Sequence, residues 1–311
     1  MTQRLISDSE TLRNVTASWW ANADFSRIDR LEYDVEQELA TVIGTDTMEW
    51  LTSGDGRAHD AWLHAATAVG YMACLRYYRL NDISHDTGSR RVKIDRDNEA
   101  RPFEWQLARD DRAHLEEYYR ALDRLLHALE GVEVFATSKI CQRMQQLIVP
   151  DADTLAALTG LDPSPWLSLR LTPYLEESQH FVERAYGSPL AALAQSADGF
   201  PPSGSLLYAA QKAVALGAIA LMGRRTSLQQ MPYALMQLVQ SNGGGNQELQ
   251  PTLDQLANYL RHLSHDQHYW LNEMRTLRDQ AAASVSGGSP AGAPTYLQVP
   301  DNAPGDKCFR L

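Results

Sequence analysis

Cysteine is scarce in this sequence. Cys74, Cys141 and Cys308 are widely spaced and form no CxxC pair, which argues against a disulfide scaffold and against a zinc site built on cysteine. Positive charge is scarce too, since 28 lysines and arginines stand against 39 acidic residues, for a net charge of -11. A chain this acidic is a poor candidate for a protein that binds nucleic acid over its whole surface.

Long apolar runs are also missing. The most apolar stretch, Leu206–Met222, contains Gln211 and Lys212 and is short for a membrane span, so we expect a buried helix there. No apolar run follows Arg4 near the start, so we expect no secretory signal. Hydrophobic residues make up 44% and charged residues 22% of the chain, which are globular values that exclude wholesale disorder. We therefore expect a soluble protein made in the cytoplasm.

Common catalytic signatures are absent. The sequence contains no GxxxxGK[ST] phosphate loop, GxSxG elbow, HExxH motif or strand-anchored GxGxxG. Cys141 has no neighbouring histidine to activate it and is interpreted as a core residue. We therefore predict no catalysis and no cofactor.

Four residues are candidates for a metal site. His265 and His268 are three residues apart and share a helix face, and Glu177 and His180 match the Glu-x-x-His spacing of di-iron bundles. That design needs a second such motif and two more glutamates, for which Asp111–His114 is a poor substitute. We interpret the four as solvated helix-surface residues and keep a metal-dependent, di-iron-like helical enzyme as an alternative.

The chain repeats itself with low identity and good register. A repeat alignment pairs Leu5–Gly56 with Ile148–Gly199, position by position and without a gap. One added residue then aligns Leu63 with Leu207. We interpret this as a tandem duplication of one helical unit. The alternative is two unrelated helical stretches whose periods coincide.

The repeat decides an ambiguous segment. Acidic residues alternate with apolar ones in Leu31–Leu39, which alone is a strand pattern. The corresponding Leu175–Phe181 does not alternate, so we predict a helix in both copies. Gly44 and Gly187 then end these helices, because glycine adopts positive φ without steric cost.

We predict an all-α protein with two similar units. A short helix is capped by Ser7 or Ser9 in the first copy and by Asp151 or Asp153 in the second. Longer helices are predicted at about 26–43, 59–80, 108–130, 169–186, 205–222 and 252–280. The domains are helical unit 1 at 1–140, helical unit 2 at 141–280, and a flexible linker with a C-terminal arm at 281–311.

Two segments are candidate interaction arms. Residues 82–103 suit a short hairpin or extended arm. Their basic residues form either a solvated face or a contact with an acidic partner or passing DNA, and they are Arg90, Arg91, Lys93 and Arg96. We expect the C-terminal arm to dock on its own body or on a neighbour. Its apolar residues are Tyr296, Leu297, Val299, Phe309 and Leu311.

An acidic row lies on the predicted helix at 26–43. It consists of Glu32, Asp34, Glu36 and Glu38. We predict that these side chains are solvated. Their functional interpretation is a channel-facing wall that repels DNA and keeps it moving.

The layout of the chain up to Glu130 resembles a known family. Leu5–Leu12, followed by an amphipathic helix that ends at Val42-Ile43-Gly44, is similar to the start of the head–tail connector (adaptor) proteins of tailed bacteriophages. An uncharacterised family encoded by phages and prophages is closer still. It resembles this chain in the N-terminal helix pair, the Ile83-Ser84…Gly88 turn, and the helix carrying Leu122, Leu125, Leu126 and Leu129. Simple adaptors carry one helical unit, whereas the repeat predicts two here.

The resemblance implies a virion structural protein without enzymatic activity. Such a protein forms a homo-oligomeric ring, typically dodecameric, beneath the portal and lines the DNA channel of the neck. The implied partners are the portal protein and a tail or second neck-ring protein, with transient non-specific DNA contact and no membrane contact. A scaffold or packaging-accessory protein that is not kept in the virion is the other alternative.

Overall fold

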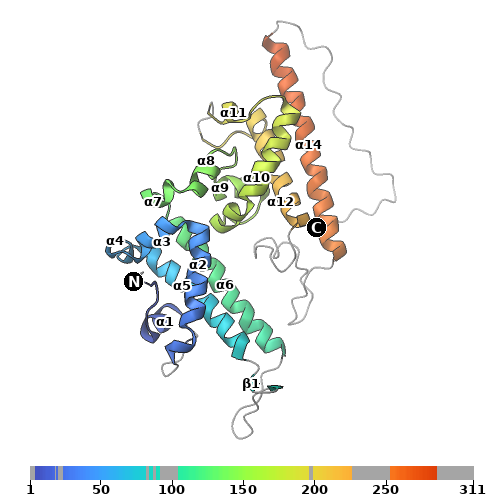
Figure 1. The fold of residues 1–311 in the computed structure, drawn as a ribbon. Coiled ribbons are helices and arrows are strands. Elements are labelled where there is room, and N and C mark those ends of the chain that lie inside the picture. Colours follow the sequence, from blue (N-terminus) through green and yellow to red (C-terminus); the bar gives the residue numbers. More distant parts are fainter. Residues whose placement is uncertain are drawn as a thin grey trace.

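Apolar residues that recur every three or four positions favour helices with one buried side, such as α2, in which Val35, Leu39 and Ile43 are buried. The computed structural model describes residues 4–17, 19, 24–81, 84–86, 89–91, 104–195, 199–225 and 253–285. The prediction of an all-α protein is confirmed in that these residues are mostly helical. Figure 1 shows α1–α6 gathered at one end of the molecule and α9–α14 at the other.

The first half contains three long helices, α2, α5 and α6, and several short helices between and around them. Its elements are α1 (Ser9–Val15), the 3-10 helix η1 (Phe25–Arg27), α2 (Asp29–Ile43), α3 (Thr45–Thr52), α4 (Gly54–Arg57), α5 (Asp60–Asn81), β1 (Ser84–Asp86), β2 (Ser89–Arg91), α6 (Glu104–Ala128) and α7 (Glu133–Ala136). The strands β1 and β2 pair antiparallel, with Ser84 opposite Arg91.

The second half also combines short and long helices. Its elements are α8 (Lys139–Gln145), α9 (Ala152–Thr159), α10 (Pro165–Tyr186), α11 (Ala191–Gln195), α12 (Leu206–Arg225) and α14 (Leu253–Val285). The six long helices that the sequence predicts are all present. The short helices α3, α4, α7, α8 and α11 were not predicted, because pieces of four to eight residues carry too few turns for a periodic signal.

The start of α1 and the end of α14 differ from the prediction, whereas the start of α9 agrees with it. The N-cap of α1 is Asp8, whose carboxylate accepts from the N–H of Thr11, so the expected cap at Ser7 or Ser9 is wrong. The expected cap at Asp151 is confirmed. Helix α14 continues to Val285, so the flexible linker does not begin at 281. The alanines at 281–283 are strong helix formers and extend the helix.

Gly44 and Gly187 end α2 and α10, as the sequence predicts. Their φ angles are 93° and 91°, a region that is costly for residues with a Cβ. Each glycine N–H closes the last turn of its helix, on Ala40 in one case and on Glu183 in the other.

Each half has its own hydrophobic core. The first core is formed by side chains between Leu5 and Phe135, and the second by side chains between Leu147 and Met274. Three residues of the second half cross over and pack against the first core, namely Cys141 of α8 and Trp166 and Leu169 at the start of α10. The molecule is therefore two packed bodies that meet where α6 contacts α10.

Among the residues that the structure describes, one helix, α12, is long and apolar enough to cross a membrane by length and composition, and 78% of its most apolar window is buried within the protein. A core helix passes the same test. Its burial between α10 and α14 agrees with the buried helix expected at Leu206–Met222.

Candidate functional site

A polar cluster on the inner side of α2 anchors the first residues of the described chain. Arg4 donates from Nε to Glu36 Oε2 at 2.7 Å and from Nη1 to Asp29 Oδ1 at 3.0 Å. The N–H of Leu5 donates to Glu36 Oε1 at 2.9 Å. Leu5 and Ile6 are buried beside these groups, so the polar contacts fix an apolar segment onto the first core.

Glu32 lies one helical turn before Glu36 and is fully buried. Neither of its carboxylate oxygens has a hydrogen-bond partner within the described part of the chain. Burial raises the pKa of Glu32 to about 8, against the charge of Arg4 and with help from the charges of Glu36 and Asp29. Because an isolated buried carboxylate is costly, Glu32 holds its proton at neutral pH.

The acidic row is therefore not a solvated wall. Glu32 and Glu36 are buried, with exposed fractions of 0% and 4%, and burial raises the pKa of Glu36 as well, against the charge of Arg4. Asp34 and Glu38 are exposed. The reason is the 3.6-residue period, which places residues 32 and 36 on the same side of α2 as Leu39 and turns residues 34 and 38 away. The expectation of a channel-facing position is wrong for Glu32 and Glu36.

The second half builds a similar anchor without charge. The N–H of Ile148 donates to Gln179 Oε1 at 2.9 Å, and the repeat alignment pairs this bond with the one from Leu5 to Glu36. In the same alignment Leu175 corresponds to Glu32, and it is also buried. The two halves thus attach corresponding segments to a helix in two ways, with a carboxylate in the first half and a neutral amide in the second. This indicates that the charged cluster has a role in packing rather than in catalysis.

Asp123 on α6 is the polar contact between the halves. Its Oδ1 accepts from the hydroxyl of Ser164 at 2.8 Å and from the N–H of Trp166 at 2.9 Å. Burial raises the pKa of Asp123, and these two hydrogen bonds oppose that rise. Ser164 also caps α10 by accepting from the N–H of Leu167. One carboxyl group therefore fixes the start of α10 against α6.

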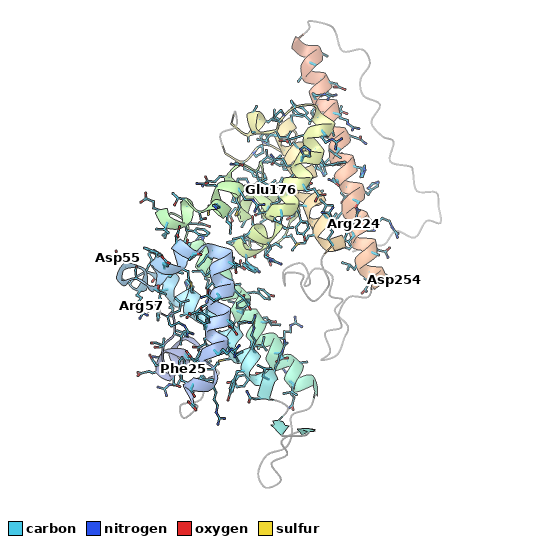
Figure 2. All side chains as sticks on the ribbon, in the orientation of Figure 1. Phe25, Asp55, Arg57, Glu176, Arg224 and Asp254 are labelled. Atoms are coloured by element: carbon cyan, nitrogen blue, oxygen red, sulfur yellow. The ribbon has the colours of Figure 1, made fainter. Side chains whose placement is uncertain are left out.

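Bidentate arginine–carboxylate ion pairs join helices at the surface. Arg76 on α5 bonds both oxygens of Glu38 on α2, at 2.8 and 2.6 Å. Arg143 on α8 bonds both oxygens of Glu176 on α10 at the same two distances. Figure 2 labels Glu176 near the middle of the second half. These exposed pairs fix orientation and add little stability.

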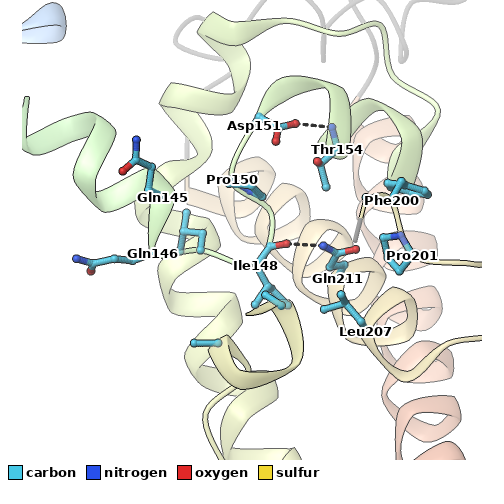
Figure 3. A pocket seen from close by; sticks show the side chains of 14 residues that line it. Gln145, Gln146, Ile148, Pro150, Asp151, Thr154, Phe200, Pro201, Leu207 and Gln211 are labelled. Atoms are coloured by element: carbon cyan, nitrogen blue, oxygen red, sulfur yellow. Dashed lines mark hydrogen bonds between the residues drawn. The ribbon is translucent and has the colours of Figure 1, made fainter. Parts of the chain in front are cut away.

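A pocket of about 740 Å³ opens in the second half, between the end of α8, α9, α11 and the start of α12 (Figure 3). Its lining includes Pro150, Asp151, Phe200, Pro201 and Leu207. On the inner wall Gln211 Nε2 donates to the carbonyl of Ile148 at 2.6 Å. The Gln211 amide oxygen is buried and has no hydrogen-bond partner among the described residues. The wall of the pocket therefore contains one buried acceptor that makes no hydrogen bond within the described residues.

Of the four candidate metal ligands, one forms an ion pair and the three histidines are exposed to solvent. Glu177 pairs with Arg225 of α12 at 2.8 Å, and His180, His265 and His268 are exposed. Within the ranges that the structure describes, no group of three or more histidine, cysteine, aspartate or glutamate side chains could hold a metal ion.

The two arms lie largely outside the described residues. Arg90 and Arg91 belong to strand β2, but the positions of their side chains are not among those described. The other arm residues lie outside the described ranges, and they are Lys93, Arg96, Tyr296, Leu297, Val299, Phe309 and Leu311. Cys74 is buried and Cys141 is half-buried, and neither is joined in a disulfide.

Sequence reasoning missed the groups that matter most here. The burial of Glu32 and Glu36 could have been predicted from the sequence. A helical period through Val35, Leu39 and Ile43 places both glutamates on the buried side of the helix. Asp123 and Gln211 gave no signal, since their partners are 41 to 63 residues away in the chain.

Comparison of the chain with models of known protein families, with curated proteins and with solved structures finds no match.

Proposed function

We propose that this chain is a non-catalytic structural subunit of a tailed-phage virion, a head–tail connector (adaptor) of the neck. Copies of the chain form a closed ring, typically dodecameric, beneath the portal protein. A tail protein or second neck ring meets the opposite side. DNA passes through the ring with transient, non-specific contact.

The observation that carries this proposal is a helical body with two cores and a long, half-covered outer helix. Each half has a separate core, and Asp123 joins them. Helix α14 has 33 residues and spans about 50 Å at its rise of 1.5 Å per residue. Its buried side includes Leu263, Leu271 and Met274, while the opposite side is exposed. A ring subunit needs such rigid walls with free faces, because a cyclic assembly joins two different faces of neighbouring copies.

We also infer that the halves are tandem copies of one helical unit. Support comes from four features that recur at positions paired by the repeat alignment. They are the caps Asp8–Thr11 and Asp151–Thr154, the hydroxyl bonds Thr16–Leu12 and Thr159–Leu155, the anchors Leu5–Glu36 and Ile148–Gln179, and the glycine ends Gly44 and Gly187. Coincident periodicity explains shared apolar positions but not shared hydrogen bonds.

The segments at 82–103 and 295–311 are the arms of this proposal. The basic residues Arg90, Arg91, Lys93 and Arg96 suit an acidic surface on a neighbour or transient contact with DNA. The apolar residues of the C-terminal arm suit a groove on an adjacent copy. The net charge of -11 suits a channel through which DNA slides without sticking.

Electron microscopy and mass determination of the full chain at high concentration test the proposal. We expect closed rings with one subunit number. A chain that stays monomeric at every concentration, alone and with portal protein, would overturn it.

The role of the C-terminal arm is tested by truncation after Val285, which leaves α14 and both cores intact. We expect unchanged helical circular dichroism and loss of rings. The matched control replaces residues 295–311 by a Gly/Ser sequence of equal length, and it should also lose rings. Normal rings from either chain would contradict the arm role.

Two measurements separate the alternatives. Mass spectrometry of mature particles should find the chain, whereas a scaffold or packaging accessory would be missing from them. Metal analysis should find no stoichiometric iron or zinc. A loaded metal would instead favour the helical enzyme.

A further inference from the structure

We propose that the N-terminal segment, residues 4–7, detaches from α2 when Glu32 loses its proton and docks again when Glu32 regains it. The segment is thus a proton-dependent cover over one side of the first core. Detachment takes place within one chain and is independent of the proposed ring.

The N-terminal segment lies outside the helices and is held by side chains of its neighbours. The peptide bond between Arg4 and Leu5 is bound at both ends. Its N–H donates to Glu36 Oε1 at 2.9 Å, and its carbonyl accepts from Arg57 Nη2 at 2.7 Å. Leu5 and Ile6 are buried and belong to the first core. Detachment therefore uncovers two apolar side chains and the part of the core that they contact.

Glu32 is the group that opposes docking once it ionises. It is fully buried, and neither of its oxygens has a hydrogen-bond partner within the part of the chain that the structure describes. The charges of Arg4 and Asp8, on either side of Leu5 and Ile6, both act on its carboxyl group, so Glu32 lies close to the segment. A neutral carboxyl group tolerates this position, whereas an isolated carboxylate is costly there. Detachment lets water reach the carboxylate and removes that cost.

An ionised Glu32 also disturbs the balance of charge around Arg4. The Arg4 guanidinium already binds two carboxylates, Glu36 at 2.7 Å and Asp29 at 3.0 Å. A charged Glu32 adds a third carboxylate, and Asp8 is a further acidic group that acts on it. Repulsion among these like charges weakens the contact between the segment and α2.

Other elements that pack against α2 are α3, α5 and η1. In α5, Arg76 pairs with Glu38 on the outer side of α2. His64 is half-buried and is influenced by the charge of Arg124. The remaining charged residues of these three elements are exposed, and they are Arg27, Asp46, Glu49, Asp60 and Arg79.

The direction of the pH effect follows from the two states of Glu32. Burial raises the pKa of Glu32 to about 8 in the docked state, against the charge of Arg4, whereas an ordinary glutamate has a pKa of 4.5. Between these values detachment releases a proton, so the fraction of detached chains rises with pH, by up to about tenfold for each pH unit. Above about pH 8 both states are ionised and the fraction levels off.

Limited digestion of the full chain with trypsin tests the detachment. The bond between Arg4 and Leu5 can enter the protease only after it leaves Glu36 and Arg57. Mass spectrometry follows release of the peptide that ends at Arg4, between about pH 6 and pH 9. At each pH the rate is divided by that of Glu32→Gln, which cannot ionise, so that the pH dependence of trypsin cancels. Glu32→Leu serves as a second reference in case the amide disturbs packing.

We expect the ratio of wild type to Glu32→Gln to rise about tenfold from pH 6 to pH 7 and to level off above pH 8, because cleavage follows the detached fraction. The ratio to Glu32→Leu should rise in the same way. Asp34→Asn is the matched control, since Asp34 is an exposed carboxylate on the same helix, and its rates should equal those of the wild type. Ratios that stay constant with pH would overturn the proposal.

Cleavage after Arg120 separates detachment from unfolding of the first half. Arg120 lies inside α6, so trypsin reaches the bond after it only when the helix opens. We expect this cleavage to be at least about ten times slower than release of the N-terminal peptide, because local opening is easier than global unfolding. Equal rates at the two bonds would show that the first half opens as a whole and would overturn a separate movement of the N-terminal segment.

Discussion

A carboxyl group buried without a hydrogen-bond partner becomes costly once it ionises. Glu32 is such a group, and it stands beside Glu36 and Asp29, which share the single charge of Arg4. Leu175 corresponds to Glu32 in the second half and is buried without that cost. The second half therefore has no counterpart to the pH dependence that Glu32 gives the first half near neutral pH.

Glu32→Leu should stabilise the protein at neutral pH. The pKa of Glu32 is about 8 when folded, against 4.5 for an ordinary glutamate. Between these values the folded chain holds a proton that the unfolded chain releases, so stability falls as pH rises, by about 1.4 kcal/mol for each pH unit. The variant loses this dependence. Its gain over the wild type should grow from about pH 5 to pH 8 and then level off, as measured by urea unfolding.

Asp34→Leu is the control for this effect, because Asp34 lies on the same helix but is exposed. Its difference from the wild type should not change across the same pH range. A Glu32→Leu gain that is equally independent of pH would show that Glu32 is ionised in the folded protein.

At the scale of elements, the short connection between α3 and α4 depends on one close approach. Gly56 is buried in the α4 turn, and its N–H donates to the Ser53 hydroxyl at 3.3 Å. A Cβ at this position would overlap the carbonyl of Trp50 and the backbone of Leu51. Gly199, its counterpart in the repeat alignment, instead has a φ of 76° and open space around it. The same residue type is thus used for two different reasons.

Gly56→Ala should lower the free energy of unfolding by about 1–3 kcal/mol, because backbone atoms cannot rotate out of the way as a side chain can. Gly54→Ala is the matched control in the same four-residue helix, since nothing lies within 4 Å of a Cβ there. Chemical unfolding of both variants measures the difference. Equal stabilities would mean that α4 shifts freely and that its packing on α3 is not specific.

The helices could be predicted from sequence where periodicity is long, and the contacts between them could not. The repeat was needed to predict α2 as a helix, because Leu31–Leu39 alternates like a strand, and glycine predicted the ends of α2 and α10. The cap at Asp8 was missed because three neighbouring polar residues can each cap a helix, and only the backbone geometry selects one. In the sequence, Gln211 only interrupts an apolar stretch. In the structure, its amide group donates to the carbonyl of Ile148 within the second half.

At the scale of the whole molecule, two separately packed cores are joined by few interactions. The start of α10 supplies most of those described here, since Trp166 and Leu169 pack on the first core, as does Cys141 of α8, and Asp123 binds the first turn of α10. Bodies with separate cores unfold together only when the contact between them is strong enough to couple them. In a ring this joint also sets the angle between the two faces that each subunit offers to its neighbours.

Asp123→Ala should uncouple the halves. It removes the acceptor of the Ser164 hydroxyl and of the Trp166 N–H, and an unsatisfied group at a partly buried helix start costs about 1–3 kcal/mol. We expect one calorimetric transition for the wild type and two for this variant. Asp123→Asn keeps an oxygen at Oδ1 and should restore one transition. Asp111→Ala removes a more exposed carboxylate of the same helix, paired with Arg79 at 2.8 Å, and should leave one transition. A split in Asp111→Ala as well, or a single transition in all three variants, would show that coupling runs through the apolar contact of α10 and not through Asp123.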